Sequence, residues 1–572
     1  MRRTRYFILP ILCALICFPV YAQEEATTGT INGRVVNERG EAMAGANVVM
    51  RAIGTYNQGR STTSDAEGNF RFDGLGPALY VISGYAPAYI LQSTETDGDE
   101  RYHRIGDSVQ LEFIKGGVIT GTVTNAAGEP IVGVRVRALR VRDPNNAISQ
   151  FRQFGSMERV TDDRGIYRIY GLSPGKYVVT AGGGNNSSSL FNPFDTDIPI
   201  YSPSSTRDTA TEYAVRGGEE TTADIRYRSE TGHTISGVVK VAGANGANVM
   251  VFSSDGMPIP VSGGFQTPSA RGFAIEGLAD GEYTLSAQEM AVGAQMPATP
   301  PDISLSETKR ITIKGADVTG IELTPRPLSA ISGVIALEPS KAPECQAKRK
   351  PAFGEMIVEL QRHEKDSDVM APILRMISPN TTPNEKGVFS MRNVAPARYR
   401  FNPRFYARYW YLQSISTGAP ATVAKTATPK NDAAANWTVV KSGEQISNLT
   451  ITLAEGAASI RGKIAVAEGA TIPSGLFVYL VPAEPNKAED VLRYFVTQVT
   501  ADGAFTLNNL PPGKYFTLVQ NQAPAETESV SKLRLPESAE ARTKLRRAAE
   551  TQKSDLELKP CQTLADYQLS FK

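Results

Sequence analysis

Three histidines are the residues of this 572-residue chain best suited to metal chemistry. They stand far apart, at His103, His233 and His363, and none lies in a His-x-x-Glu or His-Glu-x-x-His motif. A zinc hydrolase needs several ligands that converge on one metal, usually from a short motif of this kind. We therefore expect no metal site and no cofactor in this protein.

One segment matches the nucleophile elbow of serine hydrolases, G-x-S-x-G. It runs from Gly171 to Gly175 and centres on Ser173. In such an elbow the serine lies between a strand and a helix. Here the following residues read as a strand, and the equivalent position in four related segments holds Gly, Ala or Pro. We therefore interpret Ser173 as a turn residue and expect no enzymatic activity.

The third feature that could do chemistry is an aromatic run over residues 401–415. Rings with a hydroxyl or indole group suit the faces of sugars, because they combine an apolar surface with a polar group. Strand alternation would instead bury every second ring in a core, and we favour that interpretation. If any surface binds a polysaccharide, the candidates for stacking are Tyr406, Tyr409, Trp410 and Tyr411.

The elements that hold these residues are repeated five times. An aromatic residue is followed after five positions by Leu or Val, and after five more by Tyr. The aromatic and Tyr pairs are Phe70 and Tyr80, Tyr167 and Tyr177, Phe273 and Tyr283, Phe389 and Tyr399, and Phe505 and Tyr515. Such self-similarity indicates that one small unit has been copied along the chain.

Each repeat opens with a strand of the pattern Ile-x-Gly-x-Val/Ile, as at Ile31 to Val35. Alternation places Ile, Gly and Val on one face, and an inward Gly leaves room for a bulky group from another layer. The repeated aromatic residue is the obvious candidate to fill it. A polar Gly-containing turn before the aromatic residue predicts a hairpin.

The Tyr that closes the pattern follows a Pro/Gly turn. In Greek-key sandwiches a Tyr at such a corner commonly ties its hydroxyl to upstream backbone. We expect this role for Tyr80, Tyr177, Tyr283, Tyr399 and Tyr515.

The first 22 residues have the pattern of a cleaved secretory signal peptide. Three arginines precede an apolar run over 6–20, and Val20-Tyr21-Ala22 gives small residues at the cleavage site. The mature chain is expected to start near Gln23. Export to the periplasm, association with the outer membrane, or an extracellular location fits this leader equally well.

Charge and hydropathy exclude two further classes. Three of the 60 basic residues leave with the signal peptide, and the remaining 57 nearly balance 59 acidic residues. This near-neutral mature chain has no basic tract, so we expect no nucleic-acid partner. No later apolar stretch approaches the roughly 20 residues of a transmembrane helix.

Two cysteines remain after cleavage, Cys345 and Cys561. Export places them in an oxidising compartment, where disulfides persist. We therefore predict a bond between them.

Repeat spacing divides the mature chain into five β-sandwich modules. We expect module one at 23–115, module two at 116–230, module three at 231–328, module four at 329–456 and module five at 457–572. Gly-, Ser-, Asn- and Pro-rich insertions at 182–199, 341–353 and 426–436 are interpreted as loops. One short helix is expected near 536–552, on the surface because it has little apolar face.

At this point the residues resemble a known family. Segments such as GTINGRVVNERGEAMAGANVVM at 29–50 and TDDRGIYRIYGLSPGKYVVTA at 161–181 look like carboxypeptidase regulatory-like domains. The resemblance implies an all-β chain of five tandem transthyretin-like Greek-key sandwiches, within the carbohydrate-binding-like folds. It is specific for fold rather than function, because such modules occur in many exported proteins.

Our leading hypothesis is therefore an exported, non-enzymatic, rod-like scaffold or binding protein of the cell envelope. The alternative is a glycan-binding protein that uses loops or an exposed aromatic face. A hydrolase accessory protein is a more distant alternative. The expected partner is a polysaccharide or another envelope protein.

Overall fold

A computed structural model describes most of the chain after the expected signal peptide, which itself lies outside the described residues. These are residues 28–53, 59–92, 102–143, 158–184, 192–242, 245–254, 259, 262–267, 272–290, 302–346, 352–363, 366, 380–417, 432–465, 472–473, 475–521, 538–552 and 555–571.

The first three repeats are built of strands. Module one contains β1 (Gly29–Asn37), β2 (Asn47–Ala52), β3 (Gly59–Thr63), β4 (Asn69–Leu75), β5 (Tyr80–Tyr85), β6 (Tyr89–Leu91), β7 (Tyr102–His103) and β8 (Ser108–Lys115). Module two contains β9 (Gly117–Thr124), β10 (Arg135–Arg142), β11 (Glu158–Val160), β12 (Ile166–Leu172), β13 (Gly175–Ala181), β14 (Ile200–Tyr201), β15 (Tyr213–Val215), β16 (Glu220–Thr222) and β17 (Ile225–Arg226). Module three contains β18 (His233–Val239), β19 (Gly246–Ser253), β20 (Ser262–Gly263), β21 (Phe265–Gln266), β22 (Phe273–Leu278), β23 (Gly281–Met290), β24 (Ser304–Ser306), β25 (Lys309–Ile313), β26 (Val318–Leu323) and β27 (Pro325–Pro327).

The last two repeats add the described helices. Module four contains β28 (Ser329–Glu338), α1 (Pro343–Gln346), β29 (Met356–Arg362), β30 (Asn380–Thr381), β31 (Val388–Val394), β32 (Ala397–Phe405), β33 (Trp410–Thr417), β34 (Thr438–Val440) and β35 (Gln445–Glu455). Module five contains β36 (Ala458–Ala465), β37 (Leu476–Pro482), β38 (Phe495–Gln498), β39 (Ala504–Leu510), β40 (Gly513–Asn521), α4 (Ala539–Thr551), β41 (Asp555–Leu558) and β42 (Thr563–Ser570). Short 3-10 turns occur at η1 (Arg207–Thr209), η2 (Phe353–Glu355), η3 (Pro485–Lys487) and η4 (Val491–Arg493).

Every repeat forms two sheets, and its opening strand lies in the first of them. In module one the first sheet has the order β4-β1-β8-β6 and the second has the order β3-β2-β5-β7. The opening strand β1 pairs antiparallel with the aromatic strand β4 and parallel with the closing strand β8. The same pairing recurs around β9, β18, β28 and β36. The expected all-β sandwich architecture is confirmed.

The inward glycine of the opening strand is required by close packing. A Cβ on Gly33 would overlap the ring of Phe70 and the carbonyl of Val109, and one on Gly462 would meet Phe505 in the same way. The predicted pairing of this glycine with the repeated aromatic residue is therefore present. The parallel closing strand is a second reason for glycine that the sequence did not indicate.

Each repeat also has a hydrophobic core of its own. The five largest clusters of buried residues each belong to a single repeat and contain its Ile-x-Gly isoleucine, its aromatic residue and its Tyr. Alternation along the strands of both sheets brings these residues to one interior layer.

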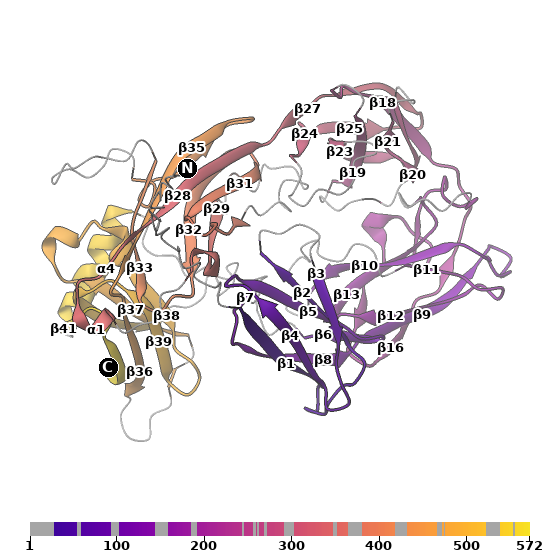
Figure 1. The fold of residues 1–572 in the computed structure, drawn as a ribbon. Coiled ribbons are helices and arrows are strands. Elements are labelled where there is room, and N and C mark those ends of the chain that lie inside the picture. Colours follow the sequence, from indigo (N-terminus) through magenta and orange to yellow (C-terminus); the bar gives the residue numbers. More distant parts are fainter. Residues whose placement is uncertain are drawn as a thin grey trace, which may run out of the picture.

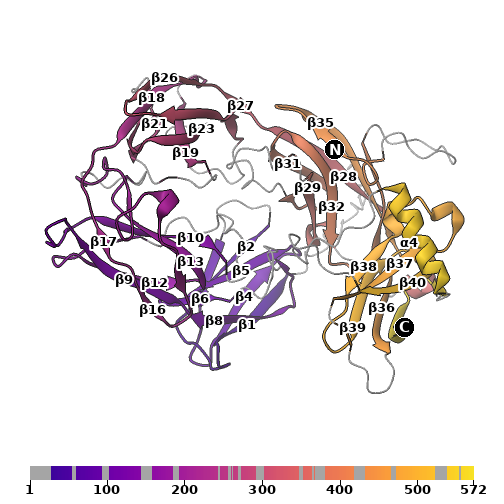
Figure 2. The same cartoon turned by 180° about the vertical axis from the view of Figure 1, so that it is seen from behind.

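The outer face of the second sheet is covered differently in each repeat. In module five, α4 lies over β37 and β40 of this sheet (Figure 2). Its Leu545, Ala548 and Ala549 pack with Phe477 and Tyr479. The helix therefore has a small apolar stripe at i, i+3 and i+4, and it is less exposed than we expected. In module three, the segment that contains β24 covers the corresponding face.

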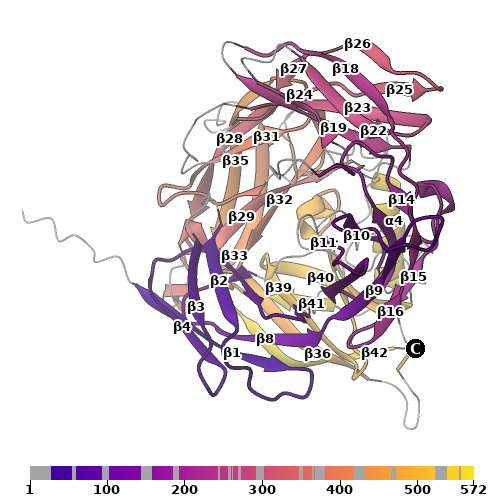
Figure 3. The same cartoon turned by 90° about the vertical axis from the view of Figure 1, so that its right-hand side faces the viewer.

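The chain does not form the rod expected from its tandem repeats. Modules one to four follow one another around a closed circle, and module four returns to module one (Figures 1 and 3). Module five extends from module four on the far side of that contact. The expectation failed because sequence periodicity defines each module but not the angle between modules.

Candidate interaction surfaces

The aromatic run of module four is divided between different environments. Trp410 opens β33 and points into the sandwich, where it is 2% exposed and lies 5.7 Å from the ring of Phe353. Such a ring offers no face to a sugar. The proposal of Trp410 as a stacking residue is therefore corrected: it is a core residue.

The other three rings do not share one surface with it. Tyr406 packs edge-on against Tyr102 of module one, with 6.5 Å between ring centroids. Tyr409 is half-buried in the turn before β33, and its carbonyl accepts hydrogen bonds from the N–H groups of Gly456 and Ala457, at the boundary between modules four and five. Tyr411 is also half-buried, and burial raises the pKa of its hydroxyl. The run thus serves the core and two module boundaries.

Tyr406 belongs to the contact that closes the circle. Leu79 and Ile357 are completely buried there, and Ile53 is 8% exposed. The guanidinium of Arg104 lies 5.9 Å from the centre of the Tyr406 ring, and its Nη1 donates to the Tyr406 carbonyl at 3.2 Å. We call these residues the ring-closing contact.

Polar contacts join the other neighbours around the circle. The Gly116 N–H donates to the Ala88 carbonyl between modules one and two, at 2.9 Å. The Gly232 N–H donates to the Thr196 carbonyl between modules two and three. Between modules three and four, the Ile303 N–H donates to Asn393 Oδ1 at 2.7 Å. Each boundary is therefore structured.

A covalent bond fixes the boundary between modules four and five. Cys345 in α1 and Cys561 before β42 form the predicted disulfide, with a Cα–Cα distance of 5.5 Å. Beside it in the same boundary, Asn509 Nδ2 donates to the carbonyls of Ala407 and Trp410 at 2.6 and 2.8 Å. A disulfide and two side-chain hydrogen bonds therefore connect modules four and five at this boundary.

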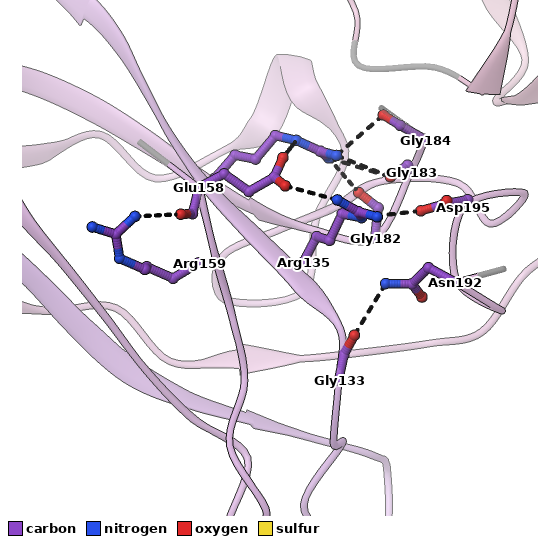
Figure 4. A network of polar contacts seen from close by, with 10 residues as sticks. Gly133, Arg135, Glu158, Arg159, Gly182, Gly183, Gly184, Asn192 and Asp195 are labelled. Carbon is purple, nitrogen blue, oxygen red and sulfur yellow. Dashed lines mark hydrogen bonds and ion pairs between the residues drawn. The ribbon is translucent and has the colours of Figure 1, made fainter. Parts of the chain in front are cut away.

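A network of buried charges anchors the insertion of module two to its second sheet (Figure 4). Arg135 and Arg137 lie two residues apart on β10, and Glu158 on β11 bridges them at 3.0 and 2.8 Å. Arg137 donates its remaining protons to the carbonyls of Gly182–Gly184. Asp195, at the other end of the insertion, faces Arg135 at 3.4 Å.

The electrostatics of this network are those of a structural clamp. Burial acts to raise the pKa of Glu158, but the guanidiniums of Arg137 and Arg135 outweigh this effect, so the pKa of Glu158 is lowered. Burial dominates at Asp195 and raises its pKa, although Arg135 pulls in the opposite direction. Burial also lowers the pKa of Arg137. Each charge thus depends on its partners, so the clamp fails if one is removed.

All five repeated tyrosines make the same hydrogen bond. The Tyr177 hydroxyl donates to the Ser173 carbonyl at 2.7 Å, and Tyr80, Tyr283, Tyr399 and Tyr515 bond likewise to the carbonyl four residues upstream. Burial raises the pKa of Tyr177, Tyr283 and Tyr515 to about 12. Ser173 occupies the turn that receives such a bond.

The three histidines lie in three different modules, and His363 adjoins Trp437, which the sequence analysis did not single out. The ring centroids of His363 and Trp437 lie 4.7 Å apart, and the guanidinium of Arg400 lies 4.4 Å from the centre of the Trp437 ring. Arg398 pairs with Asp366 at 2.8 Å and lowers its pKa to about 2. Arg398 and Arg400 alternate along β32, and Trp437 directly precedes the edge strand β34 that pairs with β32. This alternation was the one sequence feature that could have pointed to a surface cluster at Trp437.

Within the described ranges, no group of three or more His, Cys, Asp or Glu is placed to hold a metal ion. The same part of the chain contains no helix long and apolar enough to cross a membrane.

Residues 30–101 and 118–226 match the model of the carboxypeptidase regulatory-like domain family. These stretches lie in modules one and two, and the expected resemblance is confirmed there. A comparison with curated proteins found no match.

Several solved structures are similar to parts of the chain. The Bacillus anthracis TIE protein has 14% identity over 52% of this chain and 50% of that chain, with a TM-score of 0.13, so the match spans half the length of that protein. GBS52, the minor pilin of Streptococcus agalactiae, has 12% identity over 36% and 98%, with a TM-score of 0.19. The shaft pilin SpaA of Lactobacillus rhamnosus GG has 9% identity over 35% and 99%, with a TM-score of 0.17. We draw no functional conclusion from these similarities.

Proposed function

We propose that this chain is an exported, non-enzymatic scaffold of the cell envelope. Its five modules, with the boundaries proposed above, hold one another in a fixed arrangement. The observation that carries the proposal is the ring-closing contact. Leu79 and Ile357 belong to modules more than 200 residues apart in sequence, yet both are completely buried against each other's module.

The rest of the described structure uses its unusual residues for the same purpose. The disulfide fixes two modules, the arginine clamp holds an insertion, and the repeated tyrosines hold turns. Charged side chains that are bound in this way are committed to structure rather than to a reacting group.

Small-angle X-ray scattering tests the arrangement directly. We expect the scattering curve of the intact protein to fit the closed circle. Ile53→Asp buries a charge in the ring-closing contact, so it should open the circle and increase the maximum dimension. Val49→Asp is the matched control, because Val49 lies in the same module and is 38% exposed. An extended wild-type particle would contradict the proposal.

Export needs a separate measurement. N-terminal sequencing of the protein from fractionated cells should show a start near Gln23 and recovery outside the cytoplasm. An intact N-terminus in the cytoplasmic fraction would refute the envelope location without affecting the closed circle.

Glycan binding remains the second candidate function, and one observation favours it. Gln361 and Asn402 are exposed on the outer face of the second sheet of module four, next to Arg400 and Trp437. Polar side chains beside an indole ring suit sugar hydroxyls and ring faces. In affinity electrophoresis with a panel of cell-wall polysaccharides, Trp437→Ala should reduce retention, whereas Tyr409→Ala provides a comparison at the module boundary. Equal mobility of both variants and wild type in every gel would remove this alternative.

A further inference from the structure

The outer face of the first sheet in module four differs from its counterparts in the other modules. Register places Val388, Val334, Thr450 and Ser416 in one row across the four strands β31, β28, β35 and β33. The neighbouring rows contain Ser390 and Ser332 on one side, and Ala336, Thr452 and Ser414 on the other. Among the described residues, the paired strand positions of these three rows carry no charged side chain, and the exposed Lys386 lies beside them in the turn before β31.

The equivalent faces elsewhere are charged. Their outward residues include Arg34 and Arg71 in module one, Arg168 and Glu220 in module two, Glu276 and Glu322 in module three, and Arg461 and Lys463 in module five. Soluble proteins normally place charges on an open sheet face, since charges keep other sheets away. Module four lacks this protection although Val334 is 39% and Val388 is 49% exposed.

The position of this face leaves it available to another molecule. The second sheet of module four packs toward module one through Ile357. The first sheet lies on the opposite side of the same sandwich, so its outer face points away from the circle (Figure 1). A partner could therefore dock there without disturbing the ring-closing contact.

The charges at the two ends of the face indicate which partner fits. Arg392 lies two rows from Val334 toward the start of β28, and Glu338 lies two rows from it toward the end. Consider two copies that face each other through this sheet and are related by a two-fold axis that runs along the central row, perpendicular to the strands. The central row of one copy then lies opposite the same row of the other copy. This axis also brings Arg392 of one copy to the level of Glu338 of the other. The guanidinium of Arg392 already pairs with Asp302 at 3.2 Å and is half-exposed.

We propose that this face is the interface of a homodimer, with the row of Val334 on the two-fold axis. Small side chains allow the two sheets to approach to the usual spacing of about 10 Å. Four strands span about 19 Å across the sheet, and four row spacings span about 27 Å along the strands. The face of one copy therefore covers about 500 Å², and the two copies together bury about 1,000 Å². That area is near the lower limit of a specific interface, so the dimer is weak.

Sedimentation velocity of the full chain tests association. Between about 1 µM and about 500 µM, the range in which a minimal interface dissociates, the mass should rise toward twice that of the monomer. Val334→Lys brings two like charges together on the axis, so it should weaken association at least tenfold without a change in thermal unfolding. Val238→Lys is the matched control, because Val238 holds the same position in module three and is 42% exposed.

Thiol cross-linking tests the geometry. With a short bis-maleimide, Val334→Cys should give a covalent dimer, because the residue meets its own counterpart on the axis. Ser332→Cys should not, because its counterpart lies about 14 Å away along the strands. A monomer at every concentration would overturn the proposal. So would equal effects of the two lysine variants, or cross-linking of Ser332→Cys in preference to Val334→Cys.

Discussion

Replacement of Trp410 by Ala distinguishes a core residue from a ligand platform. The ring is 2% exposed and packs within the core of module four, so its removal leaves a cavity that the two sheets cannot fill. Large-to-small changes of this kind cost about 3–5 kcal/mol. With a urea m-value of about 2 kcal/mol/M, the unfolding midpoint of module four should fall by roughly 2 M.

The chain supplies its own probe for this measurement. Its two tryptophans both lie in module four, so Trp410→Ala leaves Trp437 as the sole indole reporter of that module. Tryptophan fluorescence in urea therefore follows module four while the other modules remain silent. Trp410→Phe is the control, since a second large apolar ring should recover much of the loss.

Two results would refute this reasoning. An unchanged midpoint for Trp410→Ala would show that the ring makes no core contact. Loss of polysaccharide retention at an unchanged midpoint would restore Trp410 as a ligand residue.

Three further predictions concern single contacts. Below about pH 4, module four should lose stability, because the pair of Asp366 with Arg398 stabilises the fold only while the carboxylate is ionised. This contribution is present above the ordinary pKa of an aspartate and is lost as the pH falls toward about 2. Asp366→Asn should remove this component from acid titrations followed by fluorescence. Cys345 and Cys561 of the native protein should not react with a thiol reagent. The double variant Cys345→Ser and Cys561→Ser should lower the stability of the last two modules by up to about 5 kcal/mol in calorimetry, since the bond closes a loop of 216 residues. Tyr177→Phe should cost about 1 kcal/mol in chemical denaturation, because the part-buried Ser173 carbonyl loses its hydrogen-bond donor.

The sequence predicted what depends on local periodicity. The pattern Ile-x-Gly has period two, so it placed Gly33 on the inner face, and the spacing of the repeat identified Phe70 as its partner. The bond between Cys345 and Cys561 could also be predicted, because export leaves only these two thiols.

The contacts between modules could not be predicted in the same way. Leu79 lies in the turn before β5 and Ile357 lies on β29, and the burial of both depends on module orientations that no local pattern encodes. For the aromatic run, alternation along a strand favours a core position such as that of Trp410, but it does not encode the turn that sends Tyr406 toward another module. Trp437 follows the insertion at 426–436 and belongs to no repeated pattern, so only the structure shows that it lies against Arg400 of β32.

The ring-closing contact gives the chain an unusual response to pulling force. Tension applied between the first and last modules passes directly from module one to module four and then through the disulfide-linked pair. While that contact holds, it carries the load in parallel with modules two and three, whose boundaries are also bonded. When it breaks, the whole load passes through modules two and three, and the distance between the first and last modules increases without the unfolding of any domain. The protein is thus built with a stored length that a single non-covalent contact releases.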